Sequence, residues 1–336
     1  VITDLGRLTV NDGKGFDPDP LPSGSDDDGG TIVPGTGGDD TDLDDGKEPE
    51  FYFTANATGD HLMKVLDYGA YDGKASWLTA NDYNGLMTVS PDTLSALALL
   101  LSGAQVSTFT VEYTDVAAIS YRVMPSYFYG FDDGLSDGFG GKFVYAENGL
   151  SAAVLKKLWL GSEINESDYA DYVYGEYLNV PAATKNKLYG IINSLRLSGY
   201  DKQSVEYKLE AIDAITNLFV SEYGYNEQFI KYPNDVDNVA YFLTQAKQGS
   251  RQQFASAGVV LLRMLGVPAR YCAGYKAFTL AGERYAVTKQ DMYYWAEVYF
   301  NGVGWIKVDF ESGTDSTPPS DLEQTMFYIT TDAATN

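Results

Sequence analysis

One segment constrains the fold of this chain more than any other. Residues 254–265 are apolar around nearly the whole circumference of a helix, and Gly266 and Pro268 end that helix directly afterwards. A helix of this kind must be covered on several sides. The composition after it turns to that of strands, with segments near 269–279, 283–289, 294–300 and 305–310. The sequence therefore predicts a buried helix packed against a sheet.

Two local patterns add detail to this core. A helix that Ser204 can cap carries one apolar stripe, formed by Val205, Leu209, Ile212, Ile215 and Phe219. The sequence Asn-Gly-Val-Gly at 301–304 predicts a tight hairpin between the last two strands. The longest apolar run, 94–101, falls short of the roughly 20 residues that span a bilayer, so we interpret it as a core helix or strand.

Residues 51–148 are rich in Tyr, Phe, Val and Thr, which favour strands. Short runs at 51–54 and 106–113 are separated by Gly and Asp turns, and Asp72-Gly73 stands between aromatic residues as in a hairpin. We expect a small β-rich domain here.

The first 50 residues have a different composition. They hold 14 acidic and 3 basic side chains and, from residue 11, almost no large apolar ones, so we interpret 1–50 as a disordered acidic linker. Asp40, Asp42 and Asp44 alternate as calcium ligands could, but Asp45 stands where an EF-hand loop needs Gly. A charged spacer without a metal is the simpler interpretation.

The formal net charge of -24 disfavours nucleic acid and anionic membranes as partners. A single cysteine, Cys272, allows no disulfide within the chain and no cysteine-based zinc cluster, and no cofactor motif is visible. The chain begins with Val1, so we expect a trimmed piece of an exported or membrane-anchored protein, with membrane contact only through flanking segments. No signal indicates an oligomeric state.

The stretch 249–309 carries a specific resemblance. Its first part reads Gly-Ser-Arg-Gln-Gln-Phe-Ala and continues to Leu-Gly-Val-Pro-Ala-Arg-Tyr, and its last part reads Trp-Ala-Glu-Val-Tyr-Phe-Asn-Gly-Val-Gly-Trp-Ile-Lys-Val-Asp. These motifs resemble the core of extracytoplasmic transglutaminase-like proteins of bacteria. The resemblance implies an α+β fold, with a papain-like core of helices packed on an antiparallel sheet at 149–330, and a cell-surface or extracellular location.

The same resemblance implies a catalytic triad whose members are mostly replaced. Arg251 stands for the nucleophilic Cys and Tyr293 for the His, while Asp309 keeps the orienting carboxylate. Papain-type chemistry needs a thiolate activated by an imidazole. We therefore expect a noncatalytic domain with no intact catalytic residue.

Other residues offer only weak substitutes for the triad. Cys272 lies in a strand and is expected to pack as a small apolar residue, and His61, the only histidine, is expected on the surface. Ser250 or Ser256 would need a general base that the sequence does not supply. Glu297, paired with Asp309 as in glycoside hydrolysis, is better explained as a structural residue at a sheet edge.

Arg251 begins a helix, where the dipole disfavours a cation unless an anion compensates. We therefore predict a bidentate contact between Arg251 and Asp309, with Tyr293 beside it. Two alternatives stay open: Arg251 extends to solvent and the old cleft is filled, or Arg251 binds a carboxylate of a ligand. In the second case Tyr293, Tyr294 and Trp295 would be stacking faces, although alternating Trp295 is more typical of a core.

These observations leave three hypotheses. The first is a noncatalytic binding or scaffolding module whose cleft accepts a peptide, a protein or a glycan. The second is an active cysteine protease or acyl transferase that uses a displaced nucleophile. The third is a structural spacer of a surface protein.

Overall fold

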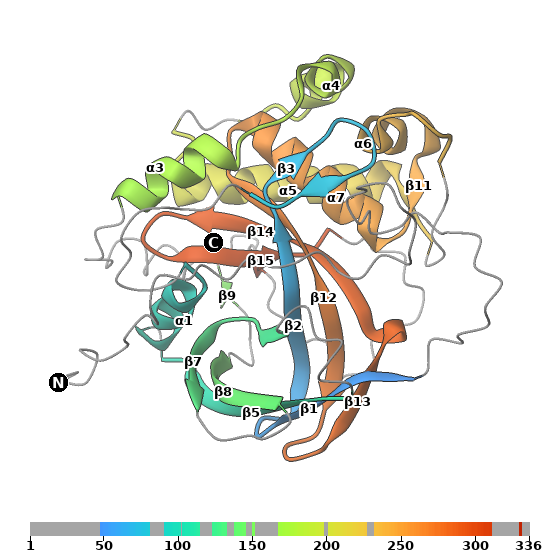
Figure 1. Ribbon diagram of the computed structural model, residues 1–336. Helices are drawn as coiled ribbons and strands as arrows, with labels where there is room; N and C mark the ends of the chain where they lie inside the picture. Colours follow the sequence, from blue (N-terminus) through green and yellow to red (C-terminus); the bar gives the residue numbers. More distant parts are fainter. Residues whose placement is uncertain are drawn as a thin grey trace.

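A computed structural model of the chain describes residues 48–80, 91–101, 103–114, 123–132, 138–145, 150–151, 167–197, 201–226, 232–310 and 329–330. The acidic linker up to residue 47 and the calcium candidates Asp40, Asp42 and Asp44 lie outside the described residues. The described part combines helices with antiparallel sheets, which confirms the α+β class (Figure 1).

The first five-stranded sheet has the order β15-β14-β12-β2-β6, and all its neighbours are antiparallel. Its strands are β15 (Gly304–Val308), β14 (Met292–Phe300), β12 (Ala269–Thr279), β2 (Gly59–Tyr68) and β6 (Met124–Pro125). The predicted hairpin joins β14 to β15, and Gly302 and Gly304 supply the positive φ angles of 72° and 96° that its turn requires. Strand β14 lies inside this sheet and carries most of the candidate site.

The second five-stranded sheet has the order β13-β1-β5-β8-β7 and is also antiparallel. Its strands are β13 (Tyr285–Thr288), β1 (Pro49–Ala55), β5 (Gln105–Tyr113), β8 (Gly138–Tyr145) and β7 (Phe128–Asp132). The strand runs expected at 51–54 and 106–113 are confirmed. The expected boundary at residue 148 does not separate the hydrogen bonding, because β13 joins this sheet while β2 and β6 join the other.

The helices lie mainly beside the first sheet (Figure 1). They are α1 (Pro91–Leu101), α3 (Ser167–Glu176), α4 (Ala182–Ser194), α5 (Val205–Glu222), α6 (Asn238–Tyr241), which continues as a π-helix through Ala246, and α7 (Arg251–Leu265). Ser204 caps α5 through its side chain, which accepts from the Tyr207 N–H. Gly266 ends α7 with a φ angle of 88°. Both helices occur where the sequence predicts them.

Three short strand pairs lie outside the two large sheets. β3 (Ala70–Tyr71) and β4 (Trp77–Leu78) form the hairpin predicted around Asp72-Gly73. The other pairs are parallel: β10 (Gly224–Tyr225) with β11 (Gln248–Gly249), and β9 (Leu150–Ser151) with β16 (Ile329–Thr330). The β10-β11 pair ends one residue before the residue that caps α7.

The side chains of β14 alternate between two environments. Tyr294, Ala296, Val298 and Phe300 belong to the main apolar core, which also includes the buried side chains of α5 and α7. Tyr293 and Trp295 point the other way and pack with Leu62 and Cys272 in a small cluster. The candidate triad position at 293 therefore lies on the face of the sheet opposite the main core.

A buried lysine ties the β14–β15 hairpin to α5. The Lys208 Nζ donates to the Tyr299 carbonyl at 2.7 Å and to Asn301 Oδ1 at 3.1 Å, and it lies 5.4 Å from the centre of the Tyr174 ring. Burial lowers the pKa of Lys208 to about 7. This contact fixes the position of the hairpin that carries Tyr293 and Asp309.

Within the described ranges, no helix is long and apolar enough to cross a membrane.

Candidate functional site

Arg251 is the first residue of α7. The helix begins there because Ser250 and Gln253 form a capping box. Gln253 Oε1 accepts from the Ser250 N–H at 2.7 Å and from the Ser250 hydroxyl at 2.6 Å. The Arg251 guanidinium carbon then lies 4.3 Å from the centre of the Tyr293 ring. Arg251 and Tyr293, the residues predicted at the Cys and His positions, are therefore in direct contact.

Tyr293 is buried, with 2% of its surface exposed, and its hydroxyl donates to Asp309 Oδ2. Two more cations approach the same ring: the Lys307 Nζ is 4.9 Å and the Lys276 Nζ is 5.3 Å from its centre. Arg251, Tyr293 and Asp309, the predicted triad positions, thus form one connected group with the Tyr293 ring at its centre.

Asp309 lies in a buried and charged environment. Its Oδ2 is 3.0 Å from the Lys307 Nζ, and the two side chains are 3% and 1% exposed. Burial alone would raise the pKa of Asp309, but the Lys307 charge, the Tyr293 hydroxyl and the Arg251 charge together lower it below its usual value. Asp309 is therefore held as a carboxylate.

Arg251 and Asp309 interact electrostatically, since the Arg251 charge helps to lower the pKa of Asp309. A bidentate contact between them stays a prediction. The expectation for Tyr293, that it packs alongside and bonds through its hydroxyl, agrees with the observed contacts. The sequence analysis did not predict Lys307 or Lys276 near this group. For Lys307 a signal exists, because a lysine inside the apolar strand 304–308 indicates a buried partner.

The other two aromatic candidates are covered by protein. Trp295 is fully buried, and its Nε1 donates to Glu297 Oε1 at 3.1 Å. Tyr294 is 9% exposed and stacks on Tyr271 with ring centres 6.1 Å apart and planes 10° apart. Neither ring offers an open face to a ligand in this structure, so the expectation that both are stacking platforms has no geometric support.

Cys272 packs as expected for a small apolar residue. It is fully buried among Leu62, Tyr293 and Trp295, and burial raises the pKa of its thiol well above the usual value. A thiol in this state is mostly protonated at neutral pH. It is therefore a poor nucleophile.

The expectation of a surface imidazole at His61 is wrong. His61 is 2% exposed, lies 5.4 Å from the Phe53 ring centre, and its Nε2 is 3.0 Å from the Ala57 carbonyl. His61 is paired with Ala277, five positions along β12 from Cys272, or about 16 Å at the usual rise of a strand. The only cysteine and the only histidine of the chain therefore cannot form a catalytic dyad.

Both candidate serines are already engaged. The Ser250 hydroxyl donates to Gln253, as described above, and the Ser256 hydroxyl accepts from the Trp77 indole at 2.8 Å. Neither contact supplies a general base.

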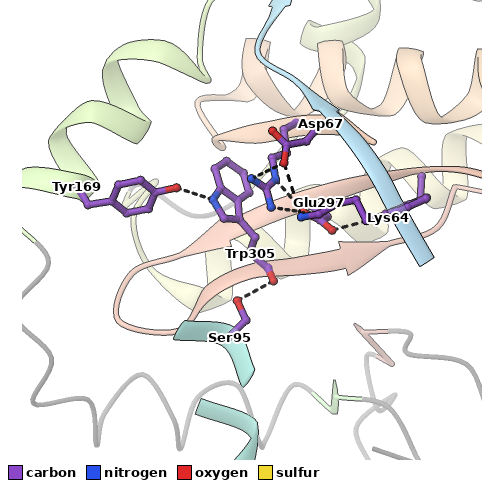
Figure 2. A network of polar contacts seen from close by, with 8 residues as sticks. Lys64, Asp67, Ser95, Tyr169, Glu297 and Trp305 are labelled. Atoms are coloured by element: carbon purple, nitrogen blue, oxygen red, sulfur yellow. Dashed lines mark hydrogen bonds and ion pairs between the residues drawn. The ribbon is translucent and has the colours of Figure 1, made fainter. Parts of the chain in front are cut away.

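Glu297 belongs to a network of buried charges (Figure 2). Its Oε2 accepts from Arg270 at 2.6 and 2.7 Å and is 3.5 Å from the Lys64 Nζ, while Arg270 also reaches Asp67 at 3.0 Å. The expectation of a sheet-edge position is wrong, because β14 has a neighbouring strand on each side. The pairing of Glu297 with two cations agrees with the structural role expected for it.

The comparisons with known proteins agree with this geometry. The family model described as the transglutaminase-like superfamily matches residues 198–310, which include α5, α7 and the strands from β12 to β15. The chain contains a transglutaminase-like domain. Arg251, Tyr293 and Asp309 all lie inside the matched range.

One curated relative of the transglutaminase-like domain is the uncharacterised protein YebA of Bacillus subtilis strain 168, with 30% identity over 173 residues. The match covers 49% of this chain but 22% of YebA, so the chain spans about a fifth of that relative's length. The crystal structure of the periplasmic domain of TgpA from Pseudomonas aeruginosa has a TM-score of 0.53 and 18% identity, and the match covers 78% of this chain and 87% of that one. This likeness supports the fold.

Proposed function

We propose that this chain is a noncatalytic transglutaminase-like domain that acts outside the cytoplasm as a binding or scaffolding module. The observation that carries the proposal is the connected group of Arg251, Tyr293 and Asp309. In an active site of the papain type, the carboxylate orients an imidazole that activates a thiolate. Here the carboxylate is bound to a phenol and an ammonium group, and the residue that we assign to the position of the thiol, Arg251, has its guanidinium over the Tyr293 ring.

The chemistry of these groups supports the proposal. A guanidinium is always charged and carries no lone pair for attack on a carbonyl. The Tyr293 hydroxyl donates a hydrogen bond to a carboxylate, so the phenol keeps its proton and does not remove one from a nucleophile. The only thiol of the chain is buried and protonated, about 16 Å along the sheet from the position of the only imidazole.

The location outside the cytoplasm is part of the same proposal. It is supported by the likeness of the fold to a periplasmic domain and by the motifs described above.

The experiment combines a thiol probe with an activity assay. We expect the native protein to resist a thiol-reactive reagent and to label fully in urea, because Cys272 is buried. We also expect no hydrolysis of peptides and no transfer of a glutamine acyl group to an amine. The matched variant Cys272→Ala separates a trace of contaminating enzyme from real turnover. Turnover that disappears in Cys272→Ala would overturn the proposal in favour of an enzyme with a displaced nucleophile.

A further inference from the structure

His61 is a buried titratable residue that the proposed function does not use. It lies on β2 of the first sheet, and its ring meets three rings of the second sheet. The centres of Phe53 on β1 and of Phe143 and Tyr145 on β8 are 5.4, 5.6 and 5.5 Å away. With 2% of its surface exposed, His61 is enclosed between the two sheets. We call this contact of four rings the sheet joint.

The hydrogen bond of His61 fixes where its proton lies. Its Nε2 is 3.0 Å from the Ala57 carbonyl, which can only accept, so Nε2 carries the hydrogen and Nδ1 holds a lone pair. Nδ1 is buried and has no hydrogen-bond partner among the residues that the structure describes. A proton added there would place a positive charge and an unpaired N–H group among aromatic rings, which is unfavourable.

We propose that His61 is an acid-sensitive switch in the fold: the neutral imidazole keeps β2 packed on β1 and β8, and protonation at Nδ1 in acid opens the sheet joint. The one bond that forms is N–H, and the proton comes from solvent. β2 also carries Leu62, which packs with Tyr293 on the opposite face of the sheet, so the sheet joint and the candidate site share a strand. The inference goes beyond the proposed function and does not depend on it.

The charged and titratable groups that surround His61 in the described part of the chain do little for its cation. Asp60, the preceding residue of β2, favours the charged form, but it lies on the other face of the sheet. Tyr145 from β8 and Tyr275 from β12 are phenols, which stay neutral in acid. β1 contributes an apolar ring. Glu283, in the turn after β12, is exposed and accepts from a backbone N–H of its own turn.

Burial sets the direction of the switch. The pKa of His61 is lowered from its usual value of about 6.5, because burial disfavours the cation more than the Ala57 carbonyl and the Asp60 charge favour it. The contribution of the neutral ring to the sheet joint is therefore fully present above about pH 6.5. It is lost as the pH falls from there through the lower pKa of the folded protein.

A second buried polar atom makes this end of the molecule easier to open. Thr279 lies on the same face of β12 two residues after Ala277, the partner of His61, and its hydroxyl is buried with no partner among the described residues. Such an atom weakens the core around it. The turn before β2 is held at the surface, where the Ala281 N–H donates to the Thr58 hydroxyl at 2.9 Å. Opening at this end is therefore expected before the whole protein unfolds.

The test uses the only histidine of the chain, whose imidazole signals are unambiguous. A proton NMR titration of the whole chain should give a midpoint below about 6.5. Hydrogen exchange followed by mass spectrometry, corrected for the intrinsic rate at each pH, measures the opening of β1, β2 and β8. The opening constant should rise by up to about 10-fold for each pH unit below about 6.5, since one proton is taken up. Exchange in α7 should not change.

Variants connect the opening to the named side chains. His61→Gln keeps a donor for the Ala57 carbonyl but cannot titrate, so the sheet joint should lose its acid response. Asp60→Asn removes the charge that favours the cation and should move the midpoint to lower pH. Asp235→Asn, which changes an exposed carboxylate elsewhere, is its matched control and should leave the midpoint unchanged. Thermal unfolding of each variant checks folding, and Asp60→Asn serves if His61→Gln does not fold.

Four results would overturn the inference. They are a midpoint at or above about 6.5, an unchanged midpoint in Asp60→Asn, the same acid response in a folded His61→Gln protein, and equal opening of α7 and the sheet joint in acid. Turnover that depends on Cys272 would refute the noncatalytic assignment and leave the switch intact. The two failures are therefore distinguishable.

Discussion

The two faces of β14 differ in the kind of contacts that their side chains make. On one face, Ala296, Val298 and Phe300 pack into the main core with α7, and almost any set of apolar side chains of suitable size would serve. On the other face, Glu297 meets Arg270 and Tyr293 meets Asp309, and each of these contacts works only with its own partner. The first face is therefore tolerant and the second specific. Tyr293, the residue predicted at the position of the triad His, lies on the specific face.

The largest test of this contrast is Glu297→Ala. It removes the more deeply buried of the two carboxylates, Glu297 and Asp67, that Arg270 and Lys64 share, so one buried and one partly buried cation each lose a partner. We expect a loss of about 3–5 kcal/mol in the free energy of unfolding. Urea unfolding followed by tryptophan fluorescence measures it.

The matched control for this variant is Glu112→Ala. It removes a carboxylate from the exposed pair with Arg284 and should cost less than about 1 kcal/mol. Equal losses in the two variants would show that the charged face is no more specific than the surface.

The apolar face is tested by Gly258→Ala in α7. An added Cβ at Gly258 would lie 2.2 Å from the Phe310 ring, which is buried against Phe219, so it must displace a packed aromatic side chain. We expect a loss of about 1–3 kcal/mol, measured by the same unfolding experiment. Because this core can adjust, the loss should be smaller than that of Glu297→Ala.

Gly190→Ala in α4 is the control for added volume in a helix. Nothing lies within 4 Å of its added Cβ, so this variant should stabilise the protein by about 0.5–1 kcal/mol through helix propensity. A stable Gly258→Ala protein would indicate that the core next to Phe310 is loosely packed.

The contrast also explains what could be predicted from the sequence. The helices α5 and α7 and the β14–β15 hairpin follow from periodicity, from a cap and from glycines, all of which are local signals. The family resemblance predicted that Arg251, Tyr293 and Asp309 lie close together, because it implies the topology of a whole domain.

Lys307 has a local signal, since it lies in an apolar strand two residues before Asp309, but Lys276 and the burial of His61 could not be found in this way. Each depends on strands from distant parts of the chain: His61 lies on β2, which joins the sheet of β12 and not a separate small β domain. Pairing between distant strands leaves no local pattern, so the charged face became visible only in the folded structure.

The smallest expected effect is on the stability of the protein at acid pH, and it tests whether Asp309 is held as a carboxylate. The pKa of Asp309 is lowered in the folded protein, so its contribution to stability is present above the unfolded pKa of about 3.9 and is lost as the pH falls through the lower folded value. In this window one proton adds a slope of at most about 1.4 kcal/mol per pH unit to the stability curve. Asp309→Asn should lack this added slope, while Asp235→Asn, which changes an exposed side chain, should keep it. Urea unfolding at a series of pH values from about 5 downwards measures the three curves. Identical slopes for the unchanged protein and Asp309→Asn would mean that Lys307 and Tyr293 do not stabilise the charged form of this carboxylate. Of the two specific pairs on this face of β14, only that of Glu297 with Arg270 would then remain.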